Sequence, residues 1–172
     1  FPFVVGVLSD IIKVDDHYNT AVESALGEYN NYLVVDTREN AQKLIAESSQ
    51  RLSIFSLDTI PQKGSTKQKY PAKSILSTIT CDAKIKKLLD ILLGDVCILS
   101  EKNVEVDTKT TDSWNWVSVA GHYFSRGFIY KSCGKGSDSV IGRKQKLEQL
   151  NIDYDKVAIQ VQKINSNLKT IV

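Results

Sequence analysis

The chain has 172 residues, of which 24% are charged and 42% hydrophobic, and its formal net charge is +2. These values are typical of one globular domain or two small lobes, and they exclude a disordered or collagen-like chain. No apolar run approaches the roughly 18 to 20 residues that a membrane-spanning helix needs, so we expect no membrane partner. The small basic excess neither requires nor excludes nucleic acid unless the charges cluster.

The first 61 residues predict a small α+β unit. Its expected elements are a helix over 18–26, a strand over 31–36, a helix over 38–48 and a strand over 52–60. Gly27 follows the first helix, where helices often end in a conformation that glycine tolerates. Thr37 can cap the second helix, and Pro61 closes the last strand.

Residues 62–73 are rich in Gly, Ser, Thr, Lys, Gln and Pro, which marks an exposed connection. We therefore predict a first lobe over 1–61, a linker over 62–73 and a second lobe over 74–139. The elements expected in the second lobe are a helix over 82–93 and strands over 96–99, 116–119 and 127–130. Gly121 lies between the last two strands and predicts a turn.

The strongest periodic pattern belongs to a helix predicted over 140–172. Its apolar residues recur at alternating steps of three and four, and we call them the seam: Leu147, Leu150, Tyr154, Val157, Val161, Ile164, Leu168 and Ile171. So narrow a stripe is typical of a coiled coil, whereas a helix packed on its own domain usually has a wider apolar face. Ala158 and Ile159 beside the seam keep that second interpretation open. No second heptad run is present, so we expect the partner helix on another segment or chain.

Three widely spaced cysteines, Cys81, Cys97 and Cys133, suit neither a disulfide framework nor a metal knuckle, and they predict a reducing compartment. The sequence has no methionine and opens on Phe1 without the features of a signal peptide. We therefore expect it to be a segment of a longer protein.

Catalytic patterns are weak in this sequence. His17 and His122 have no cysteine or histidine at zinc-ligand spacing. Residues 134–137 fail the phosphate-loop pattern, because Ile129 stands where a glycine is needed and Gly136 where a Ser or Thr is needed. Three acids before the first helix are better explained as caps: Asp10, Asp15 and Asp16. We predict no catalysis, no metal and no cofactor in this chain.

Segments along the whole chain, in this order, resemble the hinge domain of SMC (structural maintenance of chromosomes) proteins. Those that resemble its first half are residues 6–12, Tyr18, and residues 21–27, 34–37, 41–45 and 55–58. Those that resemble its second half are residues 92–95, 117–121, Gly127 and residues 141–144. No single motif is diagnostic, but their succession before a heptad helix is specific. Near-neutral charge and the lack of large insertions favour a prokaryotic, chromosome-partition or condensin type.

The resemblance implies an α+β fold with a helical and sheet first lobe, an α/β-plait-like second lobe and a C-terminal coiled-coil helix. It implies a cytoplasmic, nucleoid-associated ATPase that condenses and segregates chromosomes, with its ATPase sites in heads outside this chain. The seam would pair with the incoming helix of the same parent chain. Two hinges, most simply identical, would join lobe one to lobe two by adding strands to each other's sheets.

In this family the pairing strand of the second lobe is rich in glycine, because small residues let two backbones approach closely. The resemblance therefore implies a dimer interface at Gly121, Arg126, Gly127, Phe128, Ile129 and Tyr130. Phe128 departs from the family pattern, since a glycine is expected there. Turn chemistry explains Gly121 equally well.

Basic residues cluster where the second lobe meets the predicted helix, at Arg143, Lys144 and Lys146, with Lys135 shortly before. Family members bind DNA weakly at this junction, through contacts that would be salt-dependent and nearly blind to sequence. The alternative is a solvated helix face, because acids follow closely.

A second function from another class stays open: a regulatory or ligand-binding α+β module attached to a coiled coil in a signalling protein. A pocket with converging polar groups, or a monomeric protein, would favour it.

Overall fold

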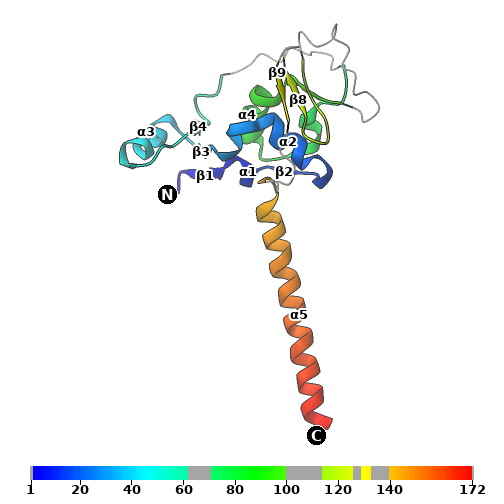
Figure 1. Cartoon of the computed structure of the whole chain (residues 1–172). Helices are drawn as coiled ribbons and strands as arrows, with labels where there is room; N and C mark the ends of the chain where they lie inside the picture. Colours follow the sequence, from blue (N-terminus) through cyan, green and yellow to red (C-terminus); the bar gives the residue numbers. More distant parts are fainter. Residues whose placement is uncertain (1, 62–70, 100–113, 126–128, 133–139, 172) are drawn as a thin grey trace.

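The chain folds into a body of short helices and small sheets, from which α5 (Arg143–Ile171) projects as one long helix (Figure 1). The computed structural model describes residues 2–61, 71–99, 114–125, 129–132 and 140–171, with the side chains of α5 described as far as Ile164. This α+β architecture with a C-terminal helix is the fold class that the sequence predicts, and it is confirmed.

One sheet has three strands in the order β1-β3-β4 and lies at the end of the body that carries the N-terminus (Figure 1). β1 (Val4–Val7) runs antiparallel to β3 (Leu33–Val35), which runs parallel to β4 (Ile54–Ser56). A parallel pair needs a crossover connection, and α3 (Arg38–Glu47) provides it.

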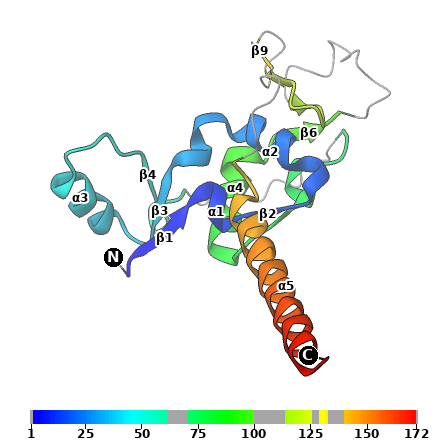
Figure 2. The same cartoon turned by 60° about the horizontal axis from the view of Figure 1, so that its bottom comes forward.

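Residues between β1 and β3 form short elements: α1 (Leu8–Ile11), β2 (Lys13–Val14), η1 (Asp16–Tyr18), α2 (Asn19–Leu26) and η2 (Gly27–Asn31). β2 pairs antiparallel with β5 (Ile79–Thr80), so a strand from the first 61 residues is joined to a strand that follows residues 62–73. Figure 2 shows β2 and α1 beside the start of α5.

The second sheet has four strands in the order β6-β7-β8-β9. The elements of this half are η3 (Ile75–Thr78), α4 (Ala83–Leu93), β6 (Val96–Ile98), β7 (Asn115–Val117), β8 (Tyr123–Ser125) and β9 (Ile129–Lys131). β6 and β7 are parallel, whereas β7, β8 and β9 form an antiparallel meander. β9 is therefore an outer strand of this sheet.

The main hydrophobic core is shared by α2, α4 and strands of both sheets. Its buried residues include Leu8, Ala21, Val22, Leu26, Val34, Ile75, Ile85, Leu88, Leu89, Leu93, Val96, Val117 and Ile141. The apolar periodicity of α4 places four residues on one buried face, as a helix on a core requires. The boundaries proposed for the lobes, the linker and the final helix stay predictions, and residues 62–70 lie outside the described part.

The predicted helices over 18–26, 38–48 and 82–93 are confirmed as α2, α3 and α4, and the helix predicted over 140–172 is present as α5 but begins at Arg143, because Gly142 before it has a positive φ. Thr37 caps α3 as expected, since its Oγ1 accepts a hydrogen bond from Asn40 N at 3.3 Å. Gly27 (φ 57°) and Gly121 (φ 85°) take the positive φ that their positions predicted. The prediction that Asp15 caps a helix is wrong: Asp15 precedes η1, but its side chain makes no cap hydrogen bond.

The predicted strands are confirmed in place but are only three residues long. The sequence patterns did not predict β1, α1, β2 or β5, and they predicted only a turn where β8 lies. These elements have two to four residues each, too few for an alternating or helical period to appear.

Two isoleucines on helices test the position of the core. Ile85 on α4 is 2% exposed, whereas Ile45 on α3 is 58% exposed. Ile85→Ala should lower the free energy of unfolding by about 2 to 5 kcal/mol, because it leaves a cavity. Ile45→Ala, the matched control, should cost less than about 1 kcal/mol. Urea unfolding followed by circular dichroism measures both, and equal losses would contradict this core.

Candidate functional site: an outer strand and an exposed helix seam

β9 presents apolar side chains at the outer edge of the four-stranded sheet. All three of its residues are exposed, with Ile129 at 37% and Tyr130 at 70%. Tyr130 stands opposite Phe124 of β8, and the two rings meet edge to face with centroids 5.4 Å apart. No strand in the described part of the chain pairs with the other side of β9. An exposed, apolar outer strand of this kind is a template for pairing with another chain.

The structure separates the residues of the predicted dimer interface. Ile129 and Tyr130 lie on β9, whereas Gly121 lies in the turn between β7 and β8, where its N–H donates to Ser118 O at 2.9 Å. Tyr123 pairs with Lys131, so this turn lies at the end of the hairpin where β9 finishes. The turn explains Gly121 directly, and its interface role stays a prediction. Arg126, Gly127 and Phe128 lie outside the described residues.

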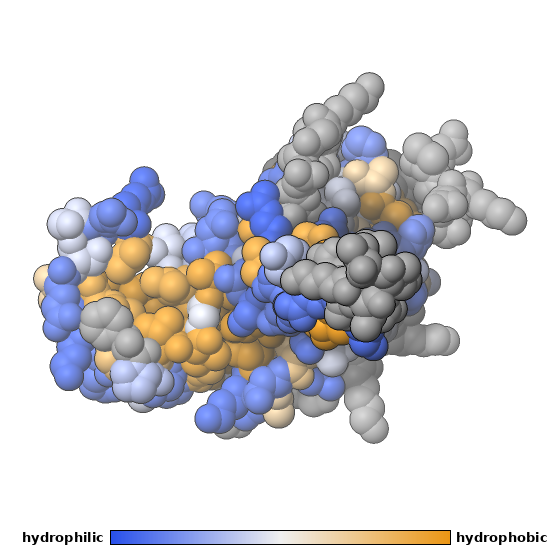
Figure 3. Space-filling view, turned by 90° about the horizontal axis from the view of Figure 1, so that it is seen from below, coloured by the Kyte–Doolittle hydropathy of each residue, from blue (hydrophilic) through white to orange (hydrophobic). Residues whose placement is uncertain are grey.

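The three-stranded sheet carries a second apolar surface. Seen from the side on which α5 leaves, apolar residues gather over the part of the body built by this sheet (Figure 3). Val5 of β1 is 46% exposed, and Val4, Val7 and all of β4 are only half-buried. α3, which crosses between β3 and β4, has no buried residue. We call this region the lobe-one apolar surface.

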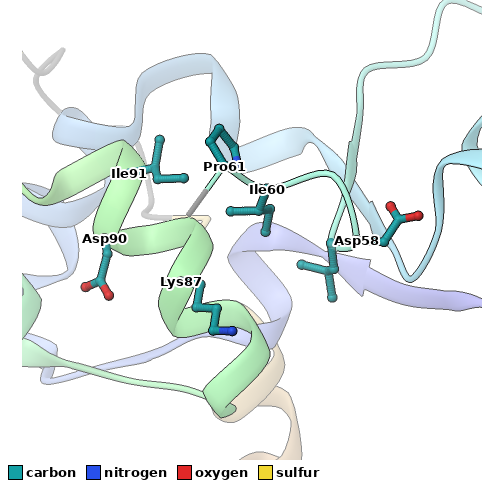
Figure 4. A pocket seen from close by; sticks show the side chains of 7 residues that line it. Asp58, Ile60, Pro61, Lys87, Asp90 and Ile91 are labelled. Carbon is teal, nitrogen blue, oxygen red and sulfur yellow. The ribbon is translucent and has the colours of Figure 1, made fainter. Parts of the chain in front are cut away.

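A shallow groove of about 250 Å³ lies between the segment after β4 and helix α4. Its lining residues are Leu57, Asp58, Ile60, Pro61, Lys87, Asp90 and Ile91. In Figure 4, Ile60 lies in the middle of the groove, with Pro61 and Ile91 above it and Lys87 below it, whereas the carboxylates of Asp58 and Asp90 point away from each other. Asp58 is also engaged, because it accepts a hydrogen bond from Arg38 N. This groove lacks the converging polar groups that a ligand-binding module would need.

The described seam residues of α5 are all exposed. Their exposed fractions are 62% for Leu147, 67% for Leu150, 74% for Tyr154, 56% for Val157, 50% for Val161 and 59% for Ile164. The side chains of Leu168 and Ile171 lie outside the described part. Ile159 follows Tyr154 by five residues, which places it about 140° around the helix. It therefore does not widen the seam, and a narrow apolar stripe without a described partner remains.

Three of the four predicted DNA-binding residues lie at the root of α5. Arg143, Lys144 and Lys146 are exposed on its first turn, where Lys146 N donates to Gly142 O at 2.9 Å. They lie within one helical turn, with Lys144 and Lys146 about 160° apart around the helix axis. Lys135 lies outside the described residues.

The described thiols are not activated nucleophiles. Burial raises the pKa of both Cys81 and Cys97 above the usual thiol value. The nearby Lys86 lowers the pKa of Cys81, but by less than burial raises it. Within the described ranges, no cluster of three or more His, Cys, Asp or Glu residues could hold a metal ion. In the same ranges, no helix has the length and apolar character needed to cross a bilayer.

Comparison with known sequences finds relatives along most of the chain. The family model described as "SMC proteins Flexible Hinge Domain" matches residues 1–103. "Chromosome partition protein Smc" of Myxococcus xanthus is 27% identical over 164 residues, covering 86% of this chain and 13% of that protein. The protein of the same name from Fusobacterium nucleatum is 31% identical over 159 residues, covering 84% and 13%. The chain thus spans about an eighth of the length of these relatives.

Solved structures share the fold. A Geobacillus stearothermophilus SMC hinge domain, described as an asymmetric dimer, has a TM-score of 0.70 at 22% identity, covering 93% of this chain and 70% of that one. A Pyrococcus furiosus Smc hinge domain with an extended coiled coil has a TM-score of 0.64 at 23% identity, covering 97% and 64%.

Proposed function

The chain belongs to the SMC flexible hinge domain family, and on that premise we propose that it is the dimerisation hinge of a chromosome-organising SMC ATPase. In this role it joins two coiled-coil arms for chromosome condensation and segregation, and the ATPase sites lie elsewhere in the parent protein. The observation that carries the proposal is the exposed apolar edge of β9 on a sheet without a further described strand. The description of a similar hinge as a dimer supports it.

The proposed partner is a second copy of the hinge, which receives β9 on its lobe-one apolar surface. Two or three backbone hydrogen bonds across a strand edge contribute only about 0.5 to 1.5 kcal/mol each. Association costs at least about 4 kcal/mol in lost freedom, so strand pairing alone is insufficient. Burial of exposed Tyr130 and Ile129 against Val5 and its neighbours would add about 1.5 to 3 kcal/mol for each side chain. The strand edge thus sets the register of the pairing, and the apolar contacts supply most of the affinity together with the specificity.

The seam of α5 is the proposed contact with the incoming helix of the same parent protein. Six described seam residues are at least half exposed, and a coiled-coil partner would bury each of them as a knob in a hole. Beside the seam, Lys156 and Asp153 form an exposed ion pair at 3.3 Å.

The dimer interface can be tested with two tyrosines of similar exposure. Tyr130→Lys places a charge at the edge of β9 and should weaken dimerisation about 30- to 150-fold, which corresponds to about 2 to 3 kcal/mol. Tyr154→Lys, on the seam, is the matched control and should leave the dimerisation constant unchanged. Sedimentation equilibrium measures both constants.

Either of two results would contradict the proposal. A folded wild-type chain that stays monomeric at high micromolar concentration would remove the dimerisation hinge. If Tyr154→Lys weakens dimerisation and Tyr130→Lys does not, two copies associate through their α5 helices.

Weak DNA binding at the root of α5 is a second proposed activity, favoured by the three exposed cations on one turn. Reversing Arg143, Lys144 and Lys146 to Glu should lower DNA affinity and reduce the slope of log affinity against log salt by about three. The control reverses Lys84, Lys86 and Lys87, which are exposed on α4 and change the net charge equally. Fluorescence anisotropy at several salt concentrations measures both variants, and equal losses would remove the assignment to α5.

A further inference from the structure

α5 is attached to the body by a very short segment. Ile141 is 2% exposed and belongs to the main core, whereas the described side chains from Leu147 onward are largely exposed. Gly142 between them has a φ of 83°, which L side chains rarely adopt, so the chain turns sharply before the helix begins. We call residues 140–142 the pivot. The direction of α5 depends on what holds these three residues.

Glu23 of α2 holds the first residue of the pivot. Its two carboxylate oxygens lie 3.1 and 3.2 Å from the amide nitrogen of Val140, which donates to the carboxylate. Hydrogen bonds to an ionised acceptor are stronger than those between neutral groups, and this one is partly shielded from water. Asn19, one turn earlier on α2, lies beside Gly142: a Cβ added to that glycine would be 3.4 Å from Asn19 Nδ2. One face of α2 therefore supports the pivot.

Ser24, the next residue of α2, contacts the sheet that carries β9. Its hydroxyl donates to Gly121 O at 2.6 Å, in the turn that connects β7 with β8. The same turn is fixed by Ser118, whose backbone N–H donates to His122 O and whose hydroxyl accepts from His122 N. Because β8 pairs along its length with β9, a displacement of the hairpin moves the acceptor of Ser24.

α2 itself is held as a rigid unit. Ala21, Val22 and Leu26 are buried in the main core. Asn30, 3% exposed, donates to the carbonyl oxygens of Glu23 and Gly27 at 2.9 and 2.7 Å, which satisfies the C-terminal end of the helix. Consecutive helical residues point about 100° apart, so Glu23 and Ser24 reach two different parts of the protein from one rigid support.

We propose that α2 couples the sheet carrying β9 to the direction of α5, with Glu23 as the residue that positions the pivot and Ser24 as its link to the sheet. The coupling rests on the proposed dimerisation through β9. A change at the β8–β9 hairpin, on forming or breaking the dimer, moves Gly121, tilts α2 through Ser24 and displaces Val140 through Glu23. α5 then changes direction as a lever.

Positioning by Glu23 is tested by a distance within one chain. Spin labels are introduced as ketone-bearing amino acids at the exposed positions Lys86 on α4 and Gln160 on α5, and labelled protein is diluted with unlabelled protein. Glu23→Ala should make the distance distribution about twice as broad, because the pivot loses its charged acceptor. Glu23→Gln keeps an acceptor oxygen and should stay close to wild type. Glu28→Ala, an exposed glutamate just after α2, is the matched control and should change nothing.

Coupling is tested in the same labelled protein by breaking the interface. Tyr130→Lys should shift the mean distance, and the shift should disappear when Ser24→Ala is also present. Circular dichroism confirms that each variant is folded. If Glu23→Ala leaves the width of the distance distribution unchanged, Glu23 does not position the pivot. If Tyr130→Lys still shifts the mean distance when Ser24→Ala is present, Ser24 does not link α2 to the sheet.

Light scattering on the labelled wild-type protein separates the two proposals. If the wild-type protein is a dimer and the mean label distance is unchanged when Tyr130→Lys dissociates it, the coupling is contradicted and the dimerisation hinge stays intact. A monomer contradicts the hinge and the coupling together, whereas the width measured for Glu23→Ala still decides the role of Glu23.

Discussion

The burial of α2 is the constraint on which the rest of the structure depends. This eight-residue helix places Ala21, Val22 and Leu26 in a core shared with α4 and with strands of both sheets. Because both sheets contribute buried residues to this main core, they stabilise each other through the helices between them. The same helix supplies Glu23 and Ser24 to the pivot and to the β7–β8 turn. Stability and the arrangement of the interacting surfaces therefore have one origin.

Most of the large apolar residues exposed in the described chain are not scattered, although Ile45, Ile152 and Ile159 stand apart. They gather on the outer strand β9, over the three-stranded sheet and along the seam of α5. Each of these places is a surface whose backbone or helical geometry favours a protein partner: a strand edge, a sheet face and a heptad stripe. Single exposed apolar residues would mean little, but three ordered sets on one small domain indicate an element of a larger assembly. This distribution agrees with membership of the SMC hinge family better than with a ligand-binding module.

Sequence patterns predicted the parts of the fold that local physics determines. The four longer helices and the cap at Thr37 follow from periodicity and from side-chain hydrogen bonding over three residues. β1, β2, β5 and β8 were missed, because so few residues show no alternating period of their own. Val140 is 117 positions from Glu23, and Gly121 is 97 positions from Ser24. Neither pair has a local signal, so the pivot and its link to the sheet emerge only from tertiary structure.

The geometry of α5 makes its pivot more important than the few contacts there suggest. A helix of 29 residues is about 44 Å long, so a tilt of about 10° at its root moves the far end by about 8 Å. The same tilt displaces an atom about 5 Å from the pivot by less than about 1 Å, so the change near the core is several times smaller than the change at the far end of the helix. A small rearrangement of α2 is therefore enough to redirect a long arm without unfolding the core. The exposed seam does not oppose this motion within the described chain, and a paired coiled coil would carry it further as one stiff rod.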